Sequence, residues 1–198
     1  MELTVPERWK RDWDVYDRAK ELGIDFKTRE EIIPDPKGRR ICSATFTPSG
    51  LVFVSGAGGG RGAITNDDES VEEGFKAGRQ AGFGHAVSLH WALHPFGDLN
   101  DVWYCVKCLG MVNSHGGGAF TKSPRVVDGY TSVWHDLFGG PLSRWAVEGE
   151  ADSFSGWHAR SAVAGFDLPG GCSIEPEMIF QIDPDLAMKI IRERGPHI

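Results

Sequence analysis

The chain has 198 residues, 40% of them hydrophobic and 25% charged, which suffices for one globular core with an appendage but not for two full domains. No apolar run reaches the roughly 18 to 20 residues of a membrane-spanning helix, and the N-terminal segment is too charged for a signal peptide. The net charge of −7 disfavours contacts with a phosphate backbone. We therefore expect a soluble, cytoplasmic protein that binds neither membrane nor nucleic acid.

The N-terminal part of the sequence predicts one helix and one hairpin. Residues 6–22 have a helical pattern that stops at Gly23. Apolar segments at 41–47 and 51–55 are separated by Pro-Ser-Gly, which is typical of a β-hairpin. The glycine-rich run 56–62 lacks the Lys-Ser/Thr of a P-loop and the spacing of a dinucleotide site, so it predicts a turn and not a phosphate site.

The longest predicted helix spans 70–93 and begins at a Ser-Val-Glu-Glu capping box. Glycines recur along it at every fourth residue and predict close packing of this helix on a sheet: Gly74, Gly78 and Gly82. His90 and His94 have the spacing of zinc ligands on a helix, but position 91 is Trp, where that motif needs Glu. We interpret both, together with His85, as structural histidines and expect no metal site.

Residues 102–112 predict a strand with apolar side chains on both faces. Such a strand is covered on both sides, and because the chain has few helices we expect one cover to be another subunit. Cys105 and Cys108 form a C-x-x-C pattern, but residues three apart in a strand point to opposite faces. We therefore expect two buried structural thiols here, and neither a zinc site nor a redox pair.

The C-terminal part predicts a helix at 126–138, strands at 158–166 and 173–181, and a polar helix at 184–193. The turn sequence Leu-Pro-Gly-Gly between the two strands predicts a second hairpin. The resulting order β-β-α-β-α-β-β is typical of an antiparallel-rich α+β domain with its helices on one face of the sheet.

Arg160 and Glu175 are charged residues inside strands that are otherwise neutral, and buried charges need partners. In the predicted hairpin the two lie about five positions apart, on the order of 16 to 20 Å, which is too far for an ion pair within one chain. They can meet only across a subunit boundary. Alternatively, Arg160 caps a sheet edge and Glu175 is solvated.

Four segments carry a resemblance to a known family: Gly-Met-Val-Asn-Ser at 110–114, Ser-Pro-x-Val-x-Asp-Gly at 123–129, His-Ala-Arg-Ser-Ala-Val at 158–163, and Leu-Pro-x-Gly-x-x-x-Glu-x-Glu at 168–177. With these motifs residues 36–183 resemble a longer branch of the Rid family, the YjgF-type or "endoribonuclease L-PSP" proteins. The resemblance implies a chorismate-mutase-like fold assembled as a homotrimer, with a ligand cleft at each subunit interface. Residues 1–35 and 184–198 would then be an N-terminal helical extension and a C-terminal helix.

The resemblance also implies roles for residues. The position of Arg160 binds the substrate carboxylate in the enamine and imine deaminases of this family, and the position of Glu175 activates the water that hydrolyses the C=N bond. Ser55 and Gly56 match a Ser-Gly pair whose backbone groups line the cleft. The reaction needs no cofactor.

Three features depart from the family pattern. The family's tyrosine and asparagine fall on Cys42 and Thr131, so activity on small enamines is in question. An insertion at about 140–156, followed by Trp157, is either a lid or pocket wall for a larger aromatic acid or an extra trimer contact. His115 and His135 are either additional acid/base groups or structural.

The sequence thus predicts an ammonia-releasing deaminase that acts on an enamine or imine carboxylic acid, with an aromatic or ring-cleavage catabolite as one form of the substrate. One alternative is a lyase that acts on an aromatic hydroxylamine acid such as hydroxylaminobenzoate. Another is a non-catalytic regulatory trimer that binds a small carboxylate. A ribonuclease is disfavoured, because the chain is acidic and lacks a basic, aromatic-lined groove.

Overall fold

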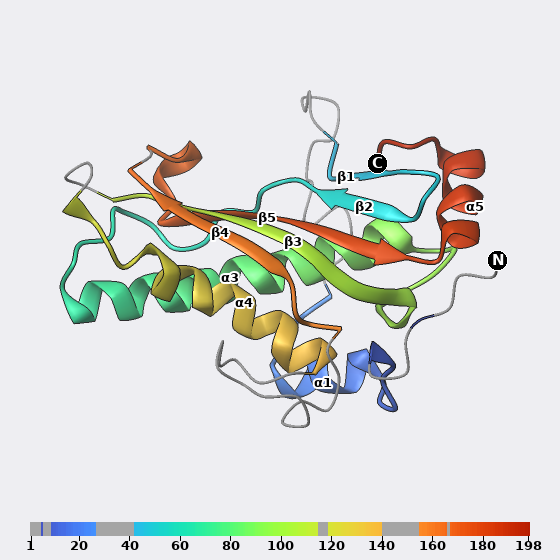
Figure 1. Cartoon of the computed structure of the whole chain (residues 1–198), viewed down its shortest axis with the longest axis horizontal. Coiled ribbons are helices and arrows are strands. Elements are labelled where there is room, and N and C mark those ends of the chain that lie inside the picture. The colour runs from blue at the N-terminus through green and yellow to red at the C-terminus, as the bar shows by residue number, and fades with distance from the viewer. Residues whose placement is uncertain (1–4, 6–8, 27–41, 115–118, 140–154, 166) are drawn as a thin grey trace.

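The computed structural model describes residues 5, 9–26, 42–114, 119–139, 155–165 and 167–198. Its elements are α1 (Val15–Glu21), β1 (Ala44–Phe46), β2 (Leu51–Val54), α3 (Asp68–Leu93), η3 (Leu99–Asp101), β3 (Val102–Val112), α4 (Ser123–Phe138), β4 (Ala159–Ala164), η5 (Pro169–Gly171), β5 (Ile174–Ile182) and α5 (Pro184–Arg194). Helices α3 and α4 run beneath the sheet on one side (Figure 1). The predicted element order and the α+β class are confirmed. No helix in the described ranges is long and apolar enough to cross a membrane.

The sheet has the order β1-β2-β5-β3-β4, in which β3 and β4 are parallel and the other neighbours are antiparallel. The predicted hairpin between the last two strands is therefore wrong, because β3 lies between them. A chain leaving β4 must reverse direction and also cross two strand spacings, about 10 Å, which a tight turn cannot span. Three glycines between the two strands have positive φ angles, which favour changes of chain direction: Gly165, Gly170 and Gly171.

The glycines of α3 face α4 and not the sheet, which corrects the predicted packing partner. A Cβ at Gly78 would lie 2.8 Å from the backbone nitrogen of Tyr130 and 2.8 Å from the carbonyl oxygen of Val126. A Cβ on Gly129 of α4 would in turn collide with the carbonyl oxygen of Phe75. The two helix backbones therefore approach too closely for side chains at these positions.

Strand β3 places both central cysteines on the helical face, so the prediction that they point to opposite faces is wrong. Cys105 pairs with Phe180 and Cys108 with Met178, and a register shift between them adds one residue to β3. Both thiols are free and buried, and burial raises their pKa values. The opposite face of β3, which carries Leu109, is only partly buried by the described residues.

Three helices begin at residues other than those predicted, and one of them is α4, which starts at Ser123 and not at 126. Helix α1 starts at Val15, where the Asp14 carboxylate accepts a hydrogen bond from the Tyr16 backbone, so the described part of 6–22 is helical only at its end. Helix α3 starts after Asp67, because the Ser70 hydroxyl accepts from the Thr65 backbone and does not cap the helix. The predicted insertion at about 140–156 lies outside the described residues except for Ser155 and Gly156.

Candidate functional site

The first group of predicted site residues, here called the glutamate cluster, comprises Cys42, Ser55, Gly56 and Glu175. The Ser55 backbone nitrogen donates to the carbonyl of Ser43, and its hydroxyl donates to the carbonyl of Cys42 over 2.7 Å. A Cβ on Gly56 would lie 2.6 Å from Oε1 of Glu175. These contacts bring all four predicted residues together where β1, β2 and β5 run side by side.

Glu175 lies on the sheet face that points away from α3 and α4, since it alternates with the buried Ile174 and Pro176. Its pKa is raised, first by partial burial and second by the neighbouring charge of Glu177. Because Gly56 has no side chain, a small molecule can approach the Glu175 carboxyl group at this position. A carboxyl group with a raised pKa can exchange protons with such a molecule.

His85 of α3 supports the glutamate cluster from within the core, and the sequence had indicated only a structural role for it. Its side chain is completely buried, with Nε2 2.8 Å from the Ser55 carbonyl oxygen and Nδ1 2.6 Å from the Tyr130 hydroxyl. Burial lowers the pKa of His85 to about 4, so the ring is neutral at pH 7. Because a carbonyl only accepts, Nε2 carries the proton and Nδ1 accepts from Tyr130.

The second group, here called the arginine cluster, comprises Asp128 and Thr131 on α4, Arg160 on β4, and Trp157 and His158 just before β4. The Nη1 of Arg160 donates to the Asp128 carboxylate over 2.6 Å and to the Thr131 hydroxyl over 3.1 Å. No group in the described ranges accepts from Nη2 or Nε of Arg160. Half of a guanidinium fork is thus available for a carboxylate ligand.

His158 completes the network around Thr131. Its Nδ1 donates to the carbonyl of Gly156 over 2.9 Å, and its Nε2 lies 3.4 Å from the Thr131 hydroxyl. Burial lowers the pKa of His158 to about 4, so the ring is neutral and Nε2 accepts from Thr131. Thr131 therefore accepts from Arg160 and donates to His158, which fixes its orientation.

An aromatic surface adjoins this network. The ring of His135, buried on α4, lies 6.1 Å from the Trp157 ring and 6.3 Å from the His158 ring, measured between centroids. The predicted pocket residue Trp157 is thus next in sequence and in space to the arginine network. His115 lies outside the described residues.

The two clusters do not meet within one chain. Arg160 is opposite Cys108 of β3, which is opposite Met178 of β5, and Glu175 lies three residues farther along β5. Two strand spacings across and three residues along amount to about 14 Å between the Cα atoms. An odd separation along the strand also places the two side chains on opposite faces of the sheet. The predicted separation therefore holds, although the hairpin on which it was based does not.

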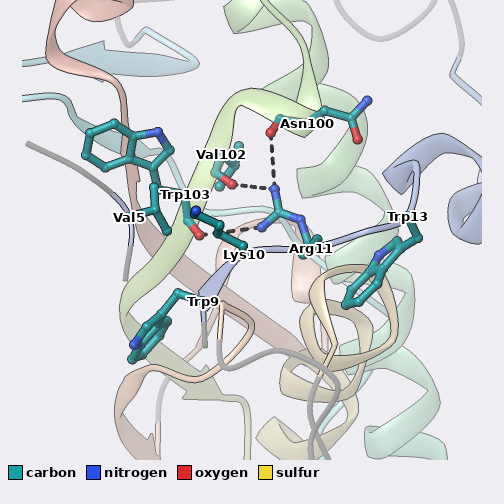
Figure 2. Close-up of a pocket in the computed structure, with 8 residues that line it drawn as sticks. All are labelled: Val5, Trp9, Lys10, Arg11, Trp13, Asn100, Val102 and Trp103. Atoms are coloured by element: carbon teal, nitrogen blue, oxygen red, sulfur yellow. Dashed lines mark hydrogen bonds between the residues drawn. The ribbon is translucent and has the colours of Figure 1, made fainter. Parts of the chain in front are cut away.

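A cavity of about 450 Å³ opens near the start of β3, between residues of the N-terminal segment and the sheet (Figure 2). It is lined by Val5, Trp9, Lys10, Arg11, Trp13, Asn100, Val102 and Trp103. Arg11 donates to the carbonyl oxygens of Asn100 and Val102 over 3.2 and 2.6 Å, and to the Ser155 hydroxyl over 2.9 Å. Burial lowers the pKa of Arg11 to about 10. Both terminal nitrogens of Arg11 already donate to groups of the protein, so we do not assign an anion site to this arginine.

The helical histidine pair is engaged in local contacts. His90 Nδ1 lies 2.6 Å from the Tyr16 hydroxyl, and the His90 and His94 rings are 5.8 Å apart between centroids. No group of three or more potential metal ligands occurs among the described residues.

Sequence reasoning did not identify three of the residues that build these clusters. Asp128 belongs to the Ser-Pro-x-Val-x-Asp-Gly motif, and His158 begins the His-Ala-Arg-Ser motif, so both had a signal. His85 had only its place in a helix of small residues.

The fold was compared with solved structures. A protein of unknown function from Agrobacterium tumefaciens is 23% identical over 85% of this chain and 92% of that one, with a TM-score of 0.63. A proposed endoribonuclease from Shewanella oneidensis MR-1 is 16% identical over 86% of this chain and 100% of that one, with a TM-score of 0.65. E. coli TdcF with bound serine is 15% identical over 71% of this chain and 87% of that one, with a TM-score of 0.39. No family model and no curated protein matches the sequence. The chain thus has the fold of the first two of these structures, the second of which is a proposed endoribonuclease. This agrees with the endoribonuclease-type fold that its motifs implied.

Proposed function

We propose that the protein releases ammonia from an imine carboxylic acid, or from an enamine acid through its imine tautomer, by hydrolysis of the C=N bond. The observation that carries this proposal is the pair of complementary clusters. One offers the guanidinium of Arg160, whose Nη2 and Nε donate to no described residue, and the other offers the carboxyl group of Glu175 with a raised pKa. An anionic substrate whose C=N bond must be hydrated needs both.

In the proposed reaction Arg160 binds the substrate carboxylate while its Nη1 stays on Asp128 and Thr131. Glu175 takes a proton from water as the water oxygen adds to the C=N carbon. It returns this proton to the nitrogen, which gives a carbinolamine. It then transfers the proton of the new hydroxyl group to the amine as the C–N bond breaks, so that a carbonyl group forms and ammonia leaves. The sum is imine plus water giving a keto acid plus ammonia, and Glu175 is left unchanged.

Because the clusters lie on opposite faces of one sheet, we propose that they meet in a homotrimer, where the arginine cluster of one subunit faces the glutamate cluster of its neighbour. Two large apolar side chains on the sheet face opposite the helices support such an interface, since Phe53 is 42% exposed and Val163 37%. Both face away from the core of the chain that carries them.

Two alternatives have support of their own. The rings of Trp157 and His135, which adjoin His158 of the arginine cluster, favour a planar aromatic acid, and this suits a lyase for an aromatic hydroxylamine acid. The Asp128 carboxylate on Arg160 favours a trimer that binds carboxylates without turning them over, because it already neutralises part of the arginine charge.

The test is ammonia release from enamines and imines generated in situ, 2-aminoacrylate and 2-aminomuconate included, and from arylhydroxylamine carboxylates. Glu175→Gln is compared with wild type, and Glu193→Gln, at an exposed position of α5, is the control. Release that Glu175→Gln abolishes and Glu193→Gln retains supports the hydrolase. Release from the arylhydroxylamines alone favours the lyase. Carboxylate binding without release from any substrate overturns the enzyme and favours the regulatory trimer.

A further inference from the structure

We propose that His85 is a positioning residue that fixes the Ser55–Gly56 peptide for catalysis, an inference that rests on the proposed function. Nε2 of His85 donates to the Ser55 carbonyl oxygen over 2.8 Å from the buried side of the sheet. The Ser55–Gly56 peptide is trans, so its N–H points opposite to its carbonyl. The Gly56 N–H is therefore directed away from α3.

This N–H is an available donor in the glutamate cluster. No group in the described part of the chain accepts a hydrogen bond from it. The Glu175 carboxylate, with Oε1 2.6 Å from the ideal Cβ position of Gly56, lies against the same residue. A water between the two would accept from the Gly56 N–H and donate to Glu175, which is the orientation that proton removal by the carboxylate requires.

The Ser55 carbonyl is the part of this segment that depends on His85. The backbone nitrogen and the hydroxyl of Ser55 are both bound to the neighbouring strand, at Ser43 and Cys42. Its carbonyl has left the β2 ladder, and His85 supplies a donor for it. Loss of that donor leaves a polar group unpaired at the core and frees the peptide to rotate.

The second nitrogen of His85 also has a partner in the core. The Tyr130 hydroxyl, itself fully buried, donates to Nδ1 over 2.6 Å, while the Ser55 carbonyl by itself already requires the proton on Nε2. Tyr130 belongs to α4, the helix that also carries Asp128 and Thr131. The His85–Tyr130 contact thus connects the helix of the arginine cluster to the backbone of the glutamate cluster.

Three variants separate positioning from general stability. His85→Leu removes both hydrogen bonds of the ring, whereas His85→Gln keeps an amide donor for the Ser55 carbonyl. Tyr130→Phe is the matched control, because it removes the same buried His85–Tyr130 bond as His85→Leu but leaves the Ser55 contact. The readouts are kcat and KM for ammonia release, and the NMR shift and hydrogen exchange of the Gly56 amide.

We expect His85→Leu to lower kcat on the order of 10- to 100-fold with KM nearly unchanged, to move the Gly56 amide signal, and to speed its exchange. His85→Gln should retain most of the kcat and a Gly56 amide signal close to that of wild type. Tyr130→Phe should change kcat and the Gly56 exchange rate by no more than a few-fold. A normal kcat and Gly56 signal in His85→Leu overturns the inference and leaves the proposed function intact. Should His85→Leu fail to fold, His85→Gln decides: a low kcat with an unmoved Gly56 signal, or a displaced Gly56 signal with a normal kcat, overturns the inference equally. Absence of turnover in the wild type overturns the proposed function, and the Gly56 signal then decides whether His85 positions the peptide.

Discussion

The glutamate cluster and the arginine cluster are held by different kinds of interaction. In the first, backbone hydrogen bonds of the hairpin and a Cβ-free glycine place Ser55, Gly56 and Glu175. In the second, an ion pair and a hydroxyl orient Arg160 at an edge strand. Backbone pairing thus positions Glu175. Arg160 is instead positioned by side chains, and its guanidinium can exchange the Asp128 carboxylate for that of a ligand. This difference suits a constant reaction step combined with an adaptable carboxylate site.

The largest expected effect comes from inactivating each cluster by a substitution in a different subunit. Arg160→Ala and Glu175→Gln should each lower activity by about 10²- to 10⁴-fold. If each cleft takes its arginine from one subunit and its glutamate from the next, random co-assembly of the two variants regenerates an intact cleft at about one interface in four. Co-expressed, equimolar mixtures should therefore recover about a quarter of wild-type ammonia release.

The control for this mixture is Arg160→Ala co-expressed with the double variant Arg160→Ala/Glu175→Gln. No subunit then carries the arginine, so activity should stay at the level of the single variant. Equal activity in both mixtures would contradict a cleft shared between subunits.

The second effect is a pH dependence of the link between the clusters. His85 has a pKa of about 4 in the folded chain and 6.5 as its ordinary value, so the unfolded state binds the proton first as pH falls. The contribution of His85 to the free energy of unfolding is therefore fully present above pH 6.5 and falls by about 3 kcal/mol as the pH is lowered to 4. His85→Gln should lack this part of the loss, as urea unfolding at pH 7, 5.5 and 4 would measure. Parallel pH curves for the two proteins would exclude a buried neutral His85.

The third effect is confined to the glutamate cluster. Gly56→Ala places a Cβ 2.6 Å from Oε1 and 2.9 Å from Cγ of Glu175, so the carboxyl group must move. We expect kcat to fall about tenfold or more, because displacements of this size disturb the reacting geometry, while carboxylate binding at Arg160 is unchanged. Gly84→Ala on the exposed side of α3 is the matched control, since no atom lies within 4 Å of its Cβ. Equal kcat in both variants would contradict the contact with Glu175.

How much of this arrangement the sequence predicts depends on how local each signal is. Strand 102–112 has the predicted bounds, because β-branched and aromatic residues favour extended backbone wherever they occur. The pairing of β4 with β3 depends instead on distant residues, so a Pro-Gly-Gly turn was misread as a hairpin. The bulge that turns Cys105 to the helical face likewise has no local signal.

The candidate site divides in the same way. Glu175 and Arg160 stood out because a charge within an apolar strand is conspicuous in the sequence itself. Asp128 did not, because a carboxylate on a helix is ordinary until the fold brings it to an arginine 32 residues away. The contact of His85 with the Ser55 carbonyl oxygen also could not be predicted, because it joins residues 30 positions apart and depends on how α3 packs against the sheet.

The smallest expected effect concerns the exchangeable partner of the arginine. Asp128→Asn keeps an oxygen for Nη1 of Arg160 but removes the negative charge that competes with a bound carboxylate. The pair is partly exposed, so we expect binding of a small carboxylate to tighten only about two- to fivefold. Asp136→Asn is the matched control, because Asp136 lies on the same helix and pairs with Arg79 over 2.9 Å. Calorimetric titration of both variants with one carboxylate measures the difference. Weaker binding in Asp128→Asn alone would mean that the ion pair must persist to orient the guanidinium, and the arginine cluster would then be as fixed as the glutamate cluster.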